Sequence, residues 1–460
     1  MFPKQQSFFV LGLSKSGNSA AEFLLKRGAK TYVYDDVGGE KISRTIDALC
    51  AQGAILVKAE EIAEMTERCD ALVLSPGIPI DHPIAVSFKR AKKAIVGETE
   101  LAVRNMKGLC VGVTGTNGKT TTVSMLTETL CAGGFSAVAC GNIGTPMIAV
   151  VEREDCDVAV AEISSFQMET LNSFCPHVAV VLNVTEDHLN RHYNMENYVF
   201  LKKKLLKNLT ETEYAVLNYD DRTARGFAEG CKAQTVWFSV KEKVNGAYLL
   251  GGALYYGEEK VLAADELPVG GLHNVQNALA TIAVAKILGV ETQTVASALK
   301  AFKGVKHRIE RIGEWQGVTY VDDSKGTNVD ATVKAVECMR SETVLLLGGK
   351  DKGYDYKPLF SALKNSKVVH AVLYGENRYK LLDGARACGY EALSLCADFE
   401  RAVKLASLTA KEGQTVLLSP ASASFDEFTG YEERGERFVG IFKDYVCKGE
   451  AVERESEETE

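Results

Sequence analysis

Cysteine pairs and long apolar runs are absent from the sequence. Its twelve cysteines are scattered, without a CxxC pair or the spacing of a metal site. This usage is typical of reduced thiols in a cytosol and argues against a disulfide framework. No stretch of about 18 uncharged apolar residues occurs, and the first residues enter a strand-like run at once. We therefore expect a soluble cytoplasmic protein without a membrane-spanning or targeting segment.

Dense positive charge is absent as well. The formal net charge is -8, and no block rich in lysine and arginine occurs. This balance argues against a general nucleic-acid or membrane binder, so an anionic ligand must be held by local sites. The end of the chain, 448–460, is acidic and poor in apolar residues, which predicts a disordered tail.

The regular part of the chain alternates between two kinds of segment. Strand-like runs such as SFFVLGL, TYVYDD and CDALVLSPG are followed by amphipathic helical stretches, which predicts an α/β fold with parallel sheets. The alternation restarts at GLCVGVTGTNGKTTT and again after KHRIERI. With 46% apolar residues the chain can form about three cores. We expect a Rossmann-like N-terminal domain (1–105), a central P-loop ATPase-type domain (106–304) and a C-terminal Rossmann-like domain (305–447).

A glycine-rich turn in VTGTNGKTTT predicts a phosphate site. Gly115 and Gly118 allow a tight turn whose backbone N–H groups can face phosphate oxygens, ahead of a helix N-terminus. Lys119 would reach the terminal phosphates, and Thr120 would offer its hydroxyl to Mg²⁺. The usual P-loop has glycine where this chain has Val113. An ordinary strand-to-helix turn is the alternative, but the flanking elements favour nucleotide binding.

Two later strands end in polar side chains. The strand in DVAVAE ends at Glu162, and the one in VVLNVTEDH runs into Asp187 and His188. Ligands of parallel sheets collect at the carboxyl ends of strands. Glu162 could also be a surface acid and His188 a structural histidine, but their positions favour a role near bound phosphate.

Several motifs together resemble the Mur ligase family. TGTNGKTT is similar to the phosphate loop of the Mur ligase and folylpolyglutamate synthase superfamily. The motifs DDSKGTN, GGKDKG and LLSPASASFDEFTGYEERG together resemble the branch of the family that adds D-glutamate. The resemblance extends over roughly residues 5–445. The resemblance implies an ATP-dependent amide ligase that adds D-glutamate to UDP-N-acetylmuramoyl-L-alanine through an acyl phosphate, in cytoplasmic peptidoglycan precursor synthesis. It implies ATP and two Mg²⁺ ions, and we expect a monomer that binds neither nucleic acid nor membrane.

The same resemblance implies roles for individual residues. The catalytic residues would be Lys119, Glu162, His188 and Lys202. The metal ligands would be Thr120, Glu162, His188 and Lys202, the last as a carbamate. ATP would contact Gly115, Thr116, Asn117, Gly118, Lys119, Thr120, Thr121, Asn274, Asn277, Arg308 and Asp323. The UDP substrate would contact Ser14, Lys15, Ser16, Gly17, Asp36, Ser75, Gly77, Asn142, Ser164, Gln167 and His188. D-Glutamate would contact Thr327, Lys352, Ser424, Phe425 and Tyr431.

Some of these positions have simpler explanations or depart from the family. Asn274 and Asn277 begin a helical stretch and could be caps. LGLSKSG lacks the middle glycine of G-x-G-x-x-G, so it is a weak dinucleotide signature. Asp36 and Val37 stand where some members of the branch have Thr and Arg, so the contacts with the UDP moiety call for a different hydrogen-bonding arrangement.

The run YVFLKKKLLKN contains one lysine that differs from its neighbours. At about 100° per residue, Lys202 falls within the apolar stripe around Tyr198, whereas Lys203, Lys204 and Lys207 point away. An ammonium there would be costly to bury and would repel Mg²⁺, so a neutral amine able to react with CO₂ is expected. The resemblance gives the same residue as a carbamylated lysine. A snorkelling lysine is the alternative.

Two other functions remain open at this point. Another Mur ligase or a folylpolyglutamate synthase-like ligase would share TGTNGKTT but use a different amino acid or substrate. A non-catalytic P-loop regulatory protein would bind ATP without substrate-dependent turnover. Glu162, His188 and Lys202 together argue against this second alternative.

Overall fold

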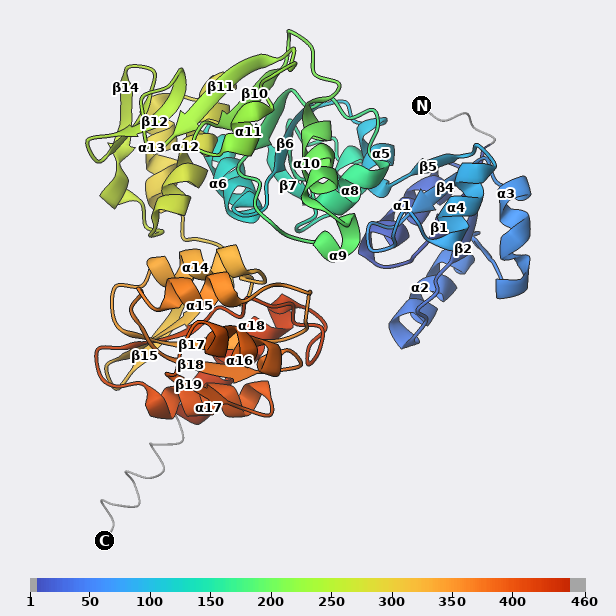
Figure 1. Cartoon of the computed structure of the whole chain (residues 1–460). Helices are drawn as coiled ribbons and strands as arrows, with labels where there is room; N and C mark the ends of the chain where they lie inside the picture. Colours follow the sequence, from blue (N-terminus) through green and yellow to red (C-terminus); the bar gives the residue numbers. More distant parts are fainter. Residues whose placement is uncertain (1–5, 447–460) are drawn as a thin grey trace. The chain divides into compact units, whose positions relative to one another are not determined.

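The computed structural model describes residues 6–446, which form two compact units (Figure 1). Unit 1 comprises Met1–Leu267 with Asn274–Phe302, and unit 2 comprises Pro268–His273 with Lys303–Glu460. Unit 1 contains two sheets and unit 2 contains the third, all with parallel cores. The α/β prediction is thus confirmed. The domain ranges given above stay predictions, and the tail 448–460 lies outside the described residues.

The first sheet is parallel and has the order β3-β2-β1-β4-β5. Its strands are β1 (Ser7–Leu11), β2 (Lys30–Tyr34), β3 (Ile55–Leu56), β4 (Ala71–Leu74) and β5 (Ala94–Val96). Its helices are α1 (Lys15–Lys26), α2 (Glu40–Ala51), α3 (Met65–Arg68) and α4 (Pro83–Arg90), with a 3-10 turn at Ala59–Glu64. The strand order changes direction between β1 and β4. Ligands of such sheets bind outside the carboxyl ends of the strands at this point, and we call this region the crevice of the first sheet.

The second sheet has the order β14-β13-β12-β11-β10-β9-β6-β8-β7. Its strands are β6 (Leu109–Thr114), β7 (Ala137–Gly141), β8 (Val158–Glu162), β9 (Val178–Val181), β10 (Tyr214–Asn218), β11 (Gln234–Ser239), β12 (Gly246–Leu250), β13 (Ala253–Tyr256) and β14 (Glu259–Ala263). Its helices are α5 (Glu98–Val103), α6 (Lys119–Ala132), α7 (Met147–Val151), α8 (Ser165–Thr170), α9 (Leu189–His192), α10 (Met195–Lys203), α11 (Arg222–Gly226), α12 (Leu272–Ile287) and α13 (Thr292–Ala301). Strands β12 to β14 pair antiparallel. The purely parallel expectation is wrong at this edge, because short glycine turns join these strands as hairpins.

The third sheet has the order β15-β16-β20-β17-β18-β19, with only β15 antiparallel to its neighbour. Its strands are β15 (Glu310–Trp315), β16 (Val318–Asp322), β17 (Thr343–Gly348), β18 (Val368–Tyr374), β19 (Leu393–Leu395) and β20 (Thr415–Leu418). Its helices are α14 (Val329–Glu337), α15 (Lys357–Leu363), α16 (Arg378–Ala387), α17 (Phe399–Thr409) and α18 (Tyr431–Ile441). The central strands β17 and β20 are buried along their whole length, as in sheets covered on both faces.

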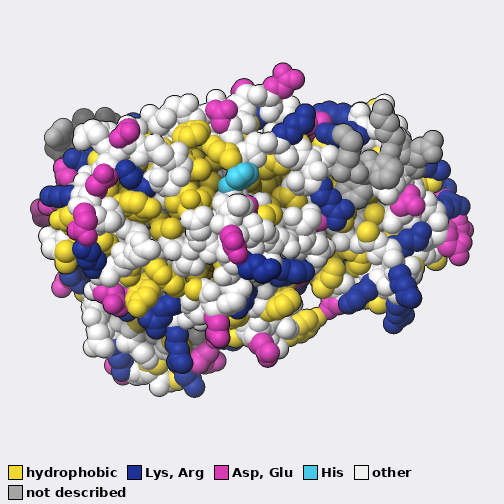
Figure 2. Space-filling model, turned by 90° about the horizontal axis from the view of Figure 1, so that it is seen from above, with side chains coloured by type: hydrophobic (Ala, Val, Ile, Leu, Met, Phe, Trp, Pro, Cys, Tyr) yellow, Lys and Arg dark blue, Asp and Glu magenta, His cyan; other side chains and the backbone are white. Residues whose placement is uncertain are grey.

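The surface carries charges of both signs. On the face in Figure 2, basic and acidic side chains are interspersed, with apolar atoms between them. Within residues 6–446, no helix combines the length and the apolar character needed to cross a membrane.

Helix α5 fixes the first sheet to the second through three buried residues. Glu98 accepts hydrogen bonds from Ile148 N, at 2.6 Å, and from Thr99 Oγ1, at 3.2 Å. The Gln167 side chain donates to Thr99 Oγ1 at 3.1 Å. Glu100 accepts from the backbone of the loop after α8 and from Arg104. The carboxylate of Glu98 therefore serves the N-terminus of α7, where negative charge is favoured.

Glu98 is expected to make the stability of unit 1 depend on pH. Burial raises its pKa to about 7, from 4.5 in an exposed chain. The folded state then keeps this proton to higher pH than the unfolded state, so the free energy of unfolding falls as pH rises from about 4.5 to about 7. Because each tenfold difference in proton affinity is worth about 1.36 kcal/mol, Glu98→Gln should gain about 2 kcal/mol relative to the parent protein between pH 5 and pH 8.

Urea denaturation at the two pH values measures this difference. A Trp315→Phe background leaves Trp237, on β11, as the fluorescent reporter of unit 1. A difference between variant and parent that stays constant from pH 5 to pH 8 would contradict the prediction.

Candidate active site

The phosphate loop lies between β6 and α6 and is fixed by distant contacts. Gly118 has φ 87°, and a Cβ there would lie 2.4 Å from Asn277 Oδ1 on α12. The backbone N–H groups of Thr116 and Asn117 donate to Asn183 Oδ1, at 3.1 and 2.8 Å. Only glycine tolerates both the positive φ and the close approach at position 118. The loop therefore leads directly into the positive end of α6.

Lysine and threonine side chains converge on this loop. Lys119 Nζ donates to the carbonyl oxygens of Gly115 and Thr116, at 2.9 and 2.8 Å. Thr120 and Thr121 follow in the buried first turn of α6. The loop thus combines an ammonium, hydroxyls and a helix N-terminus, which is a suitable arrangement for a polyphosphate.

Glu162 lies beside the phosphate loop and is buried. It ends β8, whose neighbour in the sheet is β6, and its side chain is bonded on both oxygens. Oε2 accepts from Thr120 Oγ1 and Oε1 accepts from Asn142 Nδ2, both at 2.8 Å. The alternative of a surface acid is therefore wrong. A buried carboxylate next to a hydroxyl provides the hard oxygen donors that Mg²⁺ prefers.

Asp187 and His188 follow β9, as predicted from the strand pattern. Asp187 is buried, whereas 32% of the His188 side chain is exposed. His188 Nε2 lies 3.4 Å from Asp187 Oδ2, and its backbone has φ 54°. The imidazole packs edge-on against Phe166, with ring centroids 4.8 Å apart. This histidine is thus held at the sheet edge with one side open.

Lys202 is the buried lysine of α10, as helix phase predicted. Its side chain is 1% exposed, and its Nζ donates to Gly115 O at 2.7 Å. The same carbonyl accepts from Lys119, so two amines meet at one oxygen. Burial, followed by the charge of Lys119, holds the pKa of Lys202 well below its usual range, although Glu162 and Asp187 oppose the effect. The snorkelling alternative is wrong.

The prediction for Lys204 is wrong. Helix α10 ends at Lys203 and tightens into a 3-10 turn at Lys204–Leu206, which rotates Lys204 further per residue than the α-helix phase assumes. Its Nζ donates to Met168 O, and burial lowers its pKa. Lys203 and Lys207 are exposed as expected.

The predicted adenine contacts lie inside a helix rather than at its cap. Asn274 and Asn277 are buried in α12, which begins at Leu272. Asn277 Oδ1 accepts from Thr122 Oγ1 at 3.3 Å, and Asn277 Nδ2 donates to Asn274 Oδ1 at 3.2 Å. These amides therefore connect α12 to α6 behind the phosphate loop.

The predicted uridine diphosphate residues surround the crevice of the first sheet. Ser14 and Ser75 face each other with their hydroxyl oxygens 3.3 Å apart, and Lys15 donates to Gly144 O. A Cβ at Gly17 would lie 1.8 Å from Gly12 O, so α1 approaches the end of β1 as closely as a glycine allows. Ser16 lies in the first turn of α1, and Gly77 is exposed in the loop after β4.

Asp36 has a partner that sequence reasoning missed. Its Oδ2 lies 3.1 Å from His82 Nε2. His82 Nδ1 in turn accepts from Ile84 N, at 3.3 Å, as the cap of α4. The ring therefore carries its proton on Nε2 and donates to Asp36. The His-Pro pair that starts α4 was the available signal, because it marks a cap position.

Ser164 and Gln167 form a capping box at the start of α8. Ser164 Oγ accepts from Gln167 N at 3.3 Å, and Gln167 Oε1 accepts from Ser164 N at 2.9 Å. Both therefore have a structural role, which the S-x-x-Q spacing could have indicated. Asn142 donates to Glu162 Oε1, and the Gln167 side chain donates to Thr99 Oγ1 on α5.

The predicted D-glutamate residues lie in unit 2, four on loops and Tyr431 at the first position of α18. Thr327 follows β16, Lys352 follows β17, and Ser424, Phe425 and Tyr431 follow β20. Ser424 is buried and Phe425 is exposed. Lys352 Nζ lies 3.4 Å from Tyr354 OH, and Lys325 Nζ donates to Tyr431 OH at 2.9 Å. The carboxyl ends of three adjacent strands thus present cations and hydroxyls.

Arg434 joins these loops and was missed. It is fully buried in α18, and its guanidinium donates to Ser324 O and Ser422 O at 2.8 and 3.1 Å. It also donates to Ser324 Oγ at 3.0 Å and Ala423 O at 3.3 Å. Arg434 shares a helix face with Phe438 and Ile441, so the helix-phase argument used for Lys202 would have identified it.

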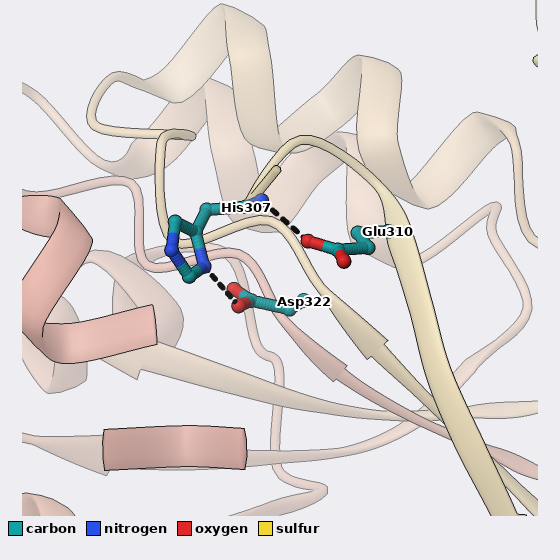
Figure 3. Close-up of side chains that lie close together, drawn as sticks. All are labelled: His307, Glu310 and Asp322. Carbon is teal, nitrogen blue, oxygen red and sulfur yellow. Dashed lines mark hydrogen bonds and ion pairs between the residues drawn. The ribbon is translucent and has the colours of Figure 1, made fainter. Parts of the chain in front are cut away.

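Arg308 and Asp323 lie close together in unit 2. Arg308 Nη1 is 3.8 Å from Asp323 Oδ1, and burial raises the pKa of Asp323 to about 6, although Arg308 lowers it. The adjacent pair is tighter, with His307 Nδ1 2.7 Å from Asp322 Oδ2 (Figure 3). Two neighbouring ion pairs therefore connect 307–308 with 322–323.

A further acid lies beside His307. Glu310 accepts from His307 N at 2.7 Å (Figure 3). Between residues 6 and 446, one group of three histidine, cysteine or acidic side chains lies close enough together to hold a metal ion. It consists of His307, Glu310 and Asp322. Since each is already hydrogen-bonded to another member, we interpret the group as a structural network.

Comparisons with known proteins cover nearly the whole chain. Three family models match: "Mur ligase MurD-like, N-terminal domain" at 6–97, "Mur ligase middle domain" at 113–285, and "Mur ligase, glutamate ligase domain" at 307–422. A relative named UDP-N-acetylmuramoylalanine--D-glutamate ligase, from Thermoanaerobacter sp. (strain X514), is 40% identical over 97% of this chain and 99% of its own length. A relative of the same name from Clostridioides difficile (strain 630) is 37% identical over 95% of this chain and 98% of its own length.

Solved structures match the fold. UDP-N-acetylmuramate-alanine ligase MurC from Thermotoga maritima aligns with a TM-score of 0.61 and 19% identity, over 95% of this chain and 99% of that chain. MurF ligase from Thermotoga maritima, in complex with ADP, aligns with a TM-score of 0.59 and 18% identity, over 96% of this chain and 95% of that chain. At this identity the likeness concerns the fold alone.

Proposed function

The chain belongs to the Mur ligase family, and from this premise we propose that it joins D-glutamate to UDP-N-acetylmuramoyl-L-alanine at the expense of ATP. The observation that carries the proposal is the buried Glu162 paired with Thr120 at the phosphate loop, beside the two amines that share Gly115 O. The reaction belongs to peptidoglycan precursor synthesis, and we place it in the cytoplasm with the chain acting as a monomer. The domain ranges 1–105, 106–304 and 305–447 are part of this proposal.

The first step forms an acyl phosphate. An oxygen of the L-alanyl carboxylate attacks the γ-phosphorus of ATP, and the bond to the β-γ bridging oxygen breaks to release ADP. When ATP binds, the ammonium group of Lys119 would leave the loop carbonyls that accept its hydrogen bonds and would contact the phosphates. There it would offset the negative charge that spreads over the phosphate oxygens. Positioning and charge neutralisation are sufficient, so no enzyme nucleophile is required.

The metal ligands fit hard oxygen-preferring ions. Thr120 and Glu162 would hold one Mg²⁺, and His188 and Lys202 would help to hold a second. When bound, the ions supply charge neutralisation and alignment of the phosphates. The buried carboxylate of Glu162 and its hydroxyl partner carry this part of the proposal, because both are oxygen donors.

Lys202 would act as a carbamate. Its neutral amine nitrogen would attack the carbon of CO₂. The N–C bond forms as one C=O π bond opens, and one proton of the amine passes to solvent, so that a neutral side chain becomes an anion. The side chain is buried next to Lys119 and points at the phosphate loop, where an anion is a better neighbour than a second ammonium. Carbamate formation therefore removes a repulsive contact and adds a metal ligand.

The second step forms the amide. The amine of D-glutamate attacks the acyl carbonyl, loses a proton, and phosphate leaves. Lys352, Thr327 and Ser424, with backbone groups near Phe425 and Tyr431, would hold the two carboxylates of the amino acid through charged and hydroxyl donors. Arg308 and Asp323 would contact ATP, and Asn274 and Asn277 the adenine. The remaining crevice residues named above would hold the UDP moiety.

A panel of amino acids tests the assignment. The protein is incubated with ATP, Mg²⁺ and UDP-N-acetylmuramoyl-L-alanine, and phosphate release is followed with D-glutamate, L-alanine, L-lysine or L-glutamate. We expect release with D-glutamate alone. Release with L-alanine or L-lysine would identify another Mur ligase, and turnover only with L-glutamate and a folate would identify a folylpolyglutamate synthase-like enzyme. ATP binding without turnover would favour the regulatory alternative.

A further inference from the structure

Arg191 directs its charge into the protein rather than toward solvent. It lies in the short helix α9, and 12% of its side chain is exposed. Nε donates to Glu169 Oε1 at 3.0 Å and Nη2 to Glu169 Oε2 at 2.6 Å. This is a two-point contact with a carboxylate whose side chain is 7% exposed. Such a geometry fixes the plane of the guanidinium.

The other edge of the guanidinium holds the loop after β4. Nη2 donates to Ile78 O at 2.8 Å and to Pro76 O at 3.4 Å, and Nη1 donates to Gly77 O at 3.3 Å. Three consecutive carbonyls of one loop therefore depend on one cation. Because its donors are directed at protein acceptors, Arg191 is suited to positioning this loop rather than to binding phosphate.

The loop 76–78 borders the crevice of the first sheet. A Cβ at Gly12 would lie 2.7 Å from Ile78 Cδ1 and 2.8 Å from Ser75 Cβ. The loop is thus packed against the glycine turn that follows β1, with Ser75 facing Ser14. A ligand that enters between these turns must contact or displace the loop, and any displacement changes the hydrogen bonds with Arg191.

Two routes lead from Arg191 toward the phosphate loop. Its guanidinium carbon lies 5.0 Å from the ring centroid of Phe166, and His188 packs on the same ring at 4.8 Å. This places a cation and the candidate metal ligand on one aromatic side chain.

The second route passes through Glu169. Its Oε1 lies 3.5 Å from His192 Nδ1, and His192 stacks on Tyr198 with centroids 5.6 Å apart. Tyr198 OH lies 3.1 Å from Thr116 Oγ1 in the phosphate loop. Each of these side chains is largely buried, so its alternative positions are limited by packing.

From this arrangement we propose that Arg191 is a positioning residue that couples the loop 76–78 to His188 and the phosphate loop, so that the UDP-linked substrate and Mg-ATP strengthen each other's binding. This inference rests on the proposed function, because it requires both ligands in unit 1. Coupling of this kind needs an element that both sites bias. We assign this role to the pair Arg191–Glu169, since the loop, Phe166 and His192 all contact it.

Binding without catalysis provides the test. Calorimetry gives the Kd of UDP-N-acetylmuramoyl-L-alanine alone and with Mg²⁺ plus a non-hydrolysable ATP analogue, in the absence of D-glutamate. For the parent protein we expect the second Kd to be about tenfold lower. Arg191→Lys keeps the charge but cannot bridge Glu169 and three carbonyls. In this variant we expect the two Kd values to agree within about twofold.

A matched variant controls for the loss of any arginine. Arg225 also lies on a short helix and stacks on an aromatic ring, 4.9 Å from the centroid of Tyr219. Arg225→Lys should keep the tenfold ratio. Glu169→Gln, which preserves the shape but removes the two-point contact, should lose the ratio and decides the question if Arg191→Lys does not fold.

The outcomes separate this inference from the proposed function. Absence of D-glutamate-dependent phosphate release by the parent protein refutes the proposed function. Two outcomes with intact turnover refute the coupling alone. In the first, the two Kd values of the parent protein do not differ. In the second, they differ tenfold in the parent protein and still differ tenfold in Arg191→Lys and Glu169→Gln.

Discussion

Lys202→Ala is expected to lower kcat about a thousandfold, with partial recovery when a short-chain carboxylic acid or bicarbonate is added. The loss corresponds to about 4 kcal/mol of transition-state stabilisation, the scale expected for an anionic group that holds a metal at the reacting phosphate. Lys202 lies in a closed site, with its Nζ 2.7 Å from Gly115 O. The space left by the missing side chain can admit a small carboxylate that replaces the carbamate anion.

Steady-state phosphate release, with and without added acetate or formate, measures this effect. Lys203→Ala is the matched control, because Lys203 follows Lys202 in α10 but its side chain is exposed. Native mass spectrometry of the parent protein, without acidification, should show an added mass equal to one CO₂ that Lys202→Ala lacks. Full activity of Lys202→Ala, or a loss that no carboxylate restores, would contradict the carbamate.

Lys119→Met is expected to reduce kcat/KM for ATP by about 10³-fold. The methionine fills a similar volume but removes the charge that, in the proposed function, would contact the β- and γ-phosphates. Cationic groups in comparable phosphoryl-transfer sites are worth about 10³-fold or more. It also removes one of the two amines that donate to Gly115 O. The effect should therefore appear in ATP turnover rather than in folding.

Kinetics at varied ATP and Mg²⁺ concentrations check this prediction. Lys107→Met is the control, because Lys107 lies exposed just before β6, at the opposite end of the strand that leads into the phosphate loop. A change of less than tenfold in kcat/KM for Lys119→Met would contradict the assigned role.

Features encoded by neighbouring residues could be predicted from the sequence. The turn at Gly118, the carboxylate that ends β8 and the inward face of Lys202 all follow from local spacing and period. Helix phase failed for Lys204 only because the helix tightens after Lys203, and no local residue marks that change. The α/β alternation could be predicted because it also follows from local patterns. The hairpins from β12 to β14 depend on short glycine turns, which the alternation does not reveal.

Contacts between distant segments could not be predicted in this way. Arg191 contacts a loop more than one hundred residues earlier in the chain, and the Asn277 amide packs on Gly118 from a helix well after the loop. Composition and period carry no information about which segments meet. The contacts of Glu98 with Ile148 and of Asp36 with His82 belong to the same class. The roles assigned to the site residues stay predictions.

The position of Arg434 near the end of the described chain has a consequence for biosynthesis. A nascent chain that has emerged as far as β20 contains all the strands of the third sheet, but not the guanidinium that joins the loops after β16, β17 and β20. Domains fold as units while synthesis proceeds from the N-terminus. The second sheet can therefore complete its phosphate loop while the loops after β16, β17 and β20 still lack their common donor. The loops after β16, β17 and β20 therefore gain this common donor only after α18 has been translated.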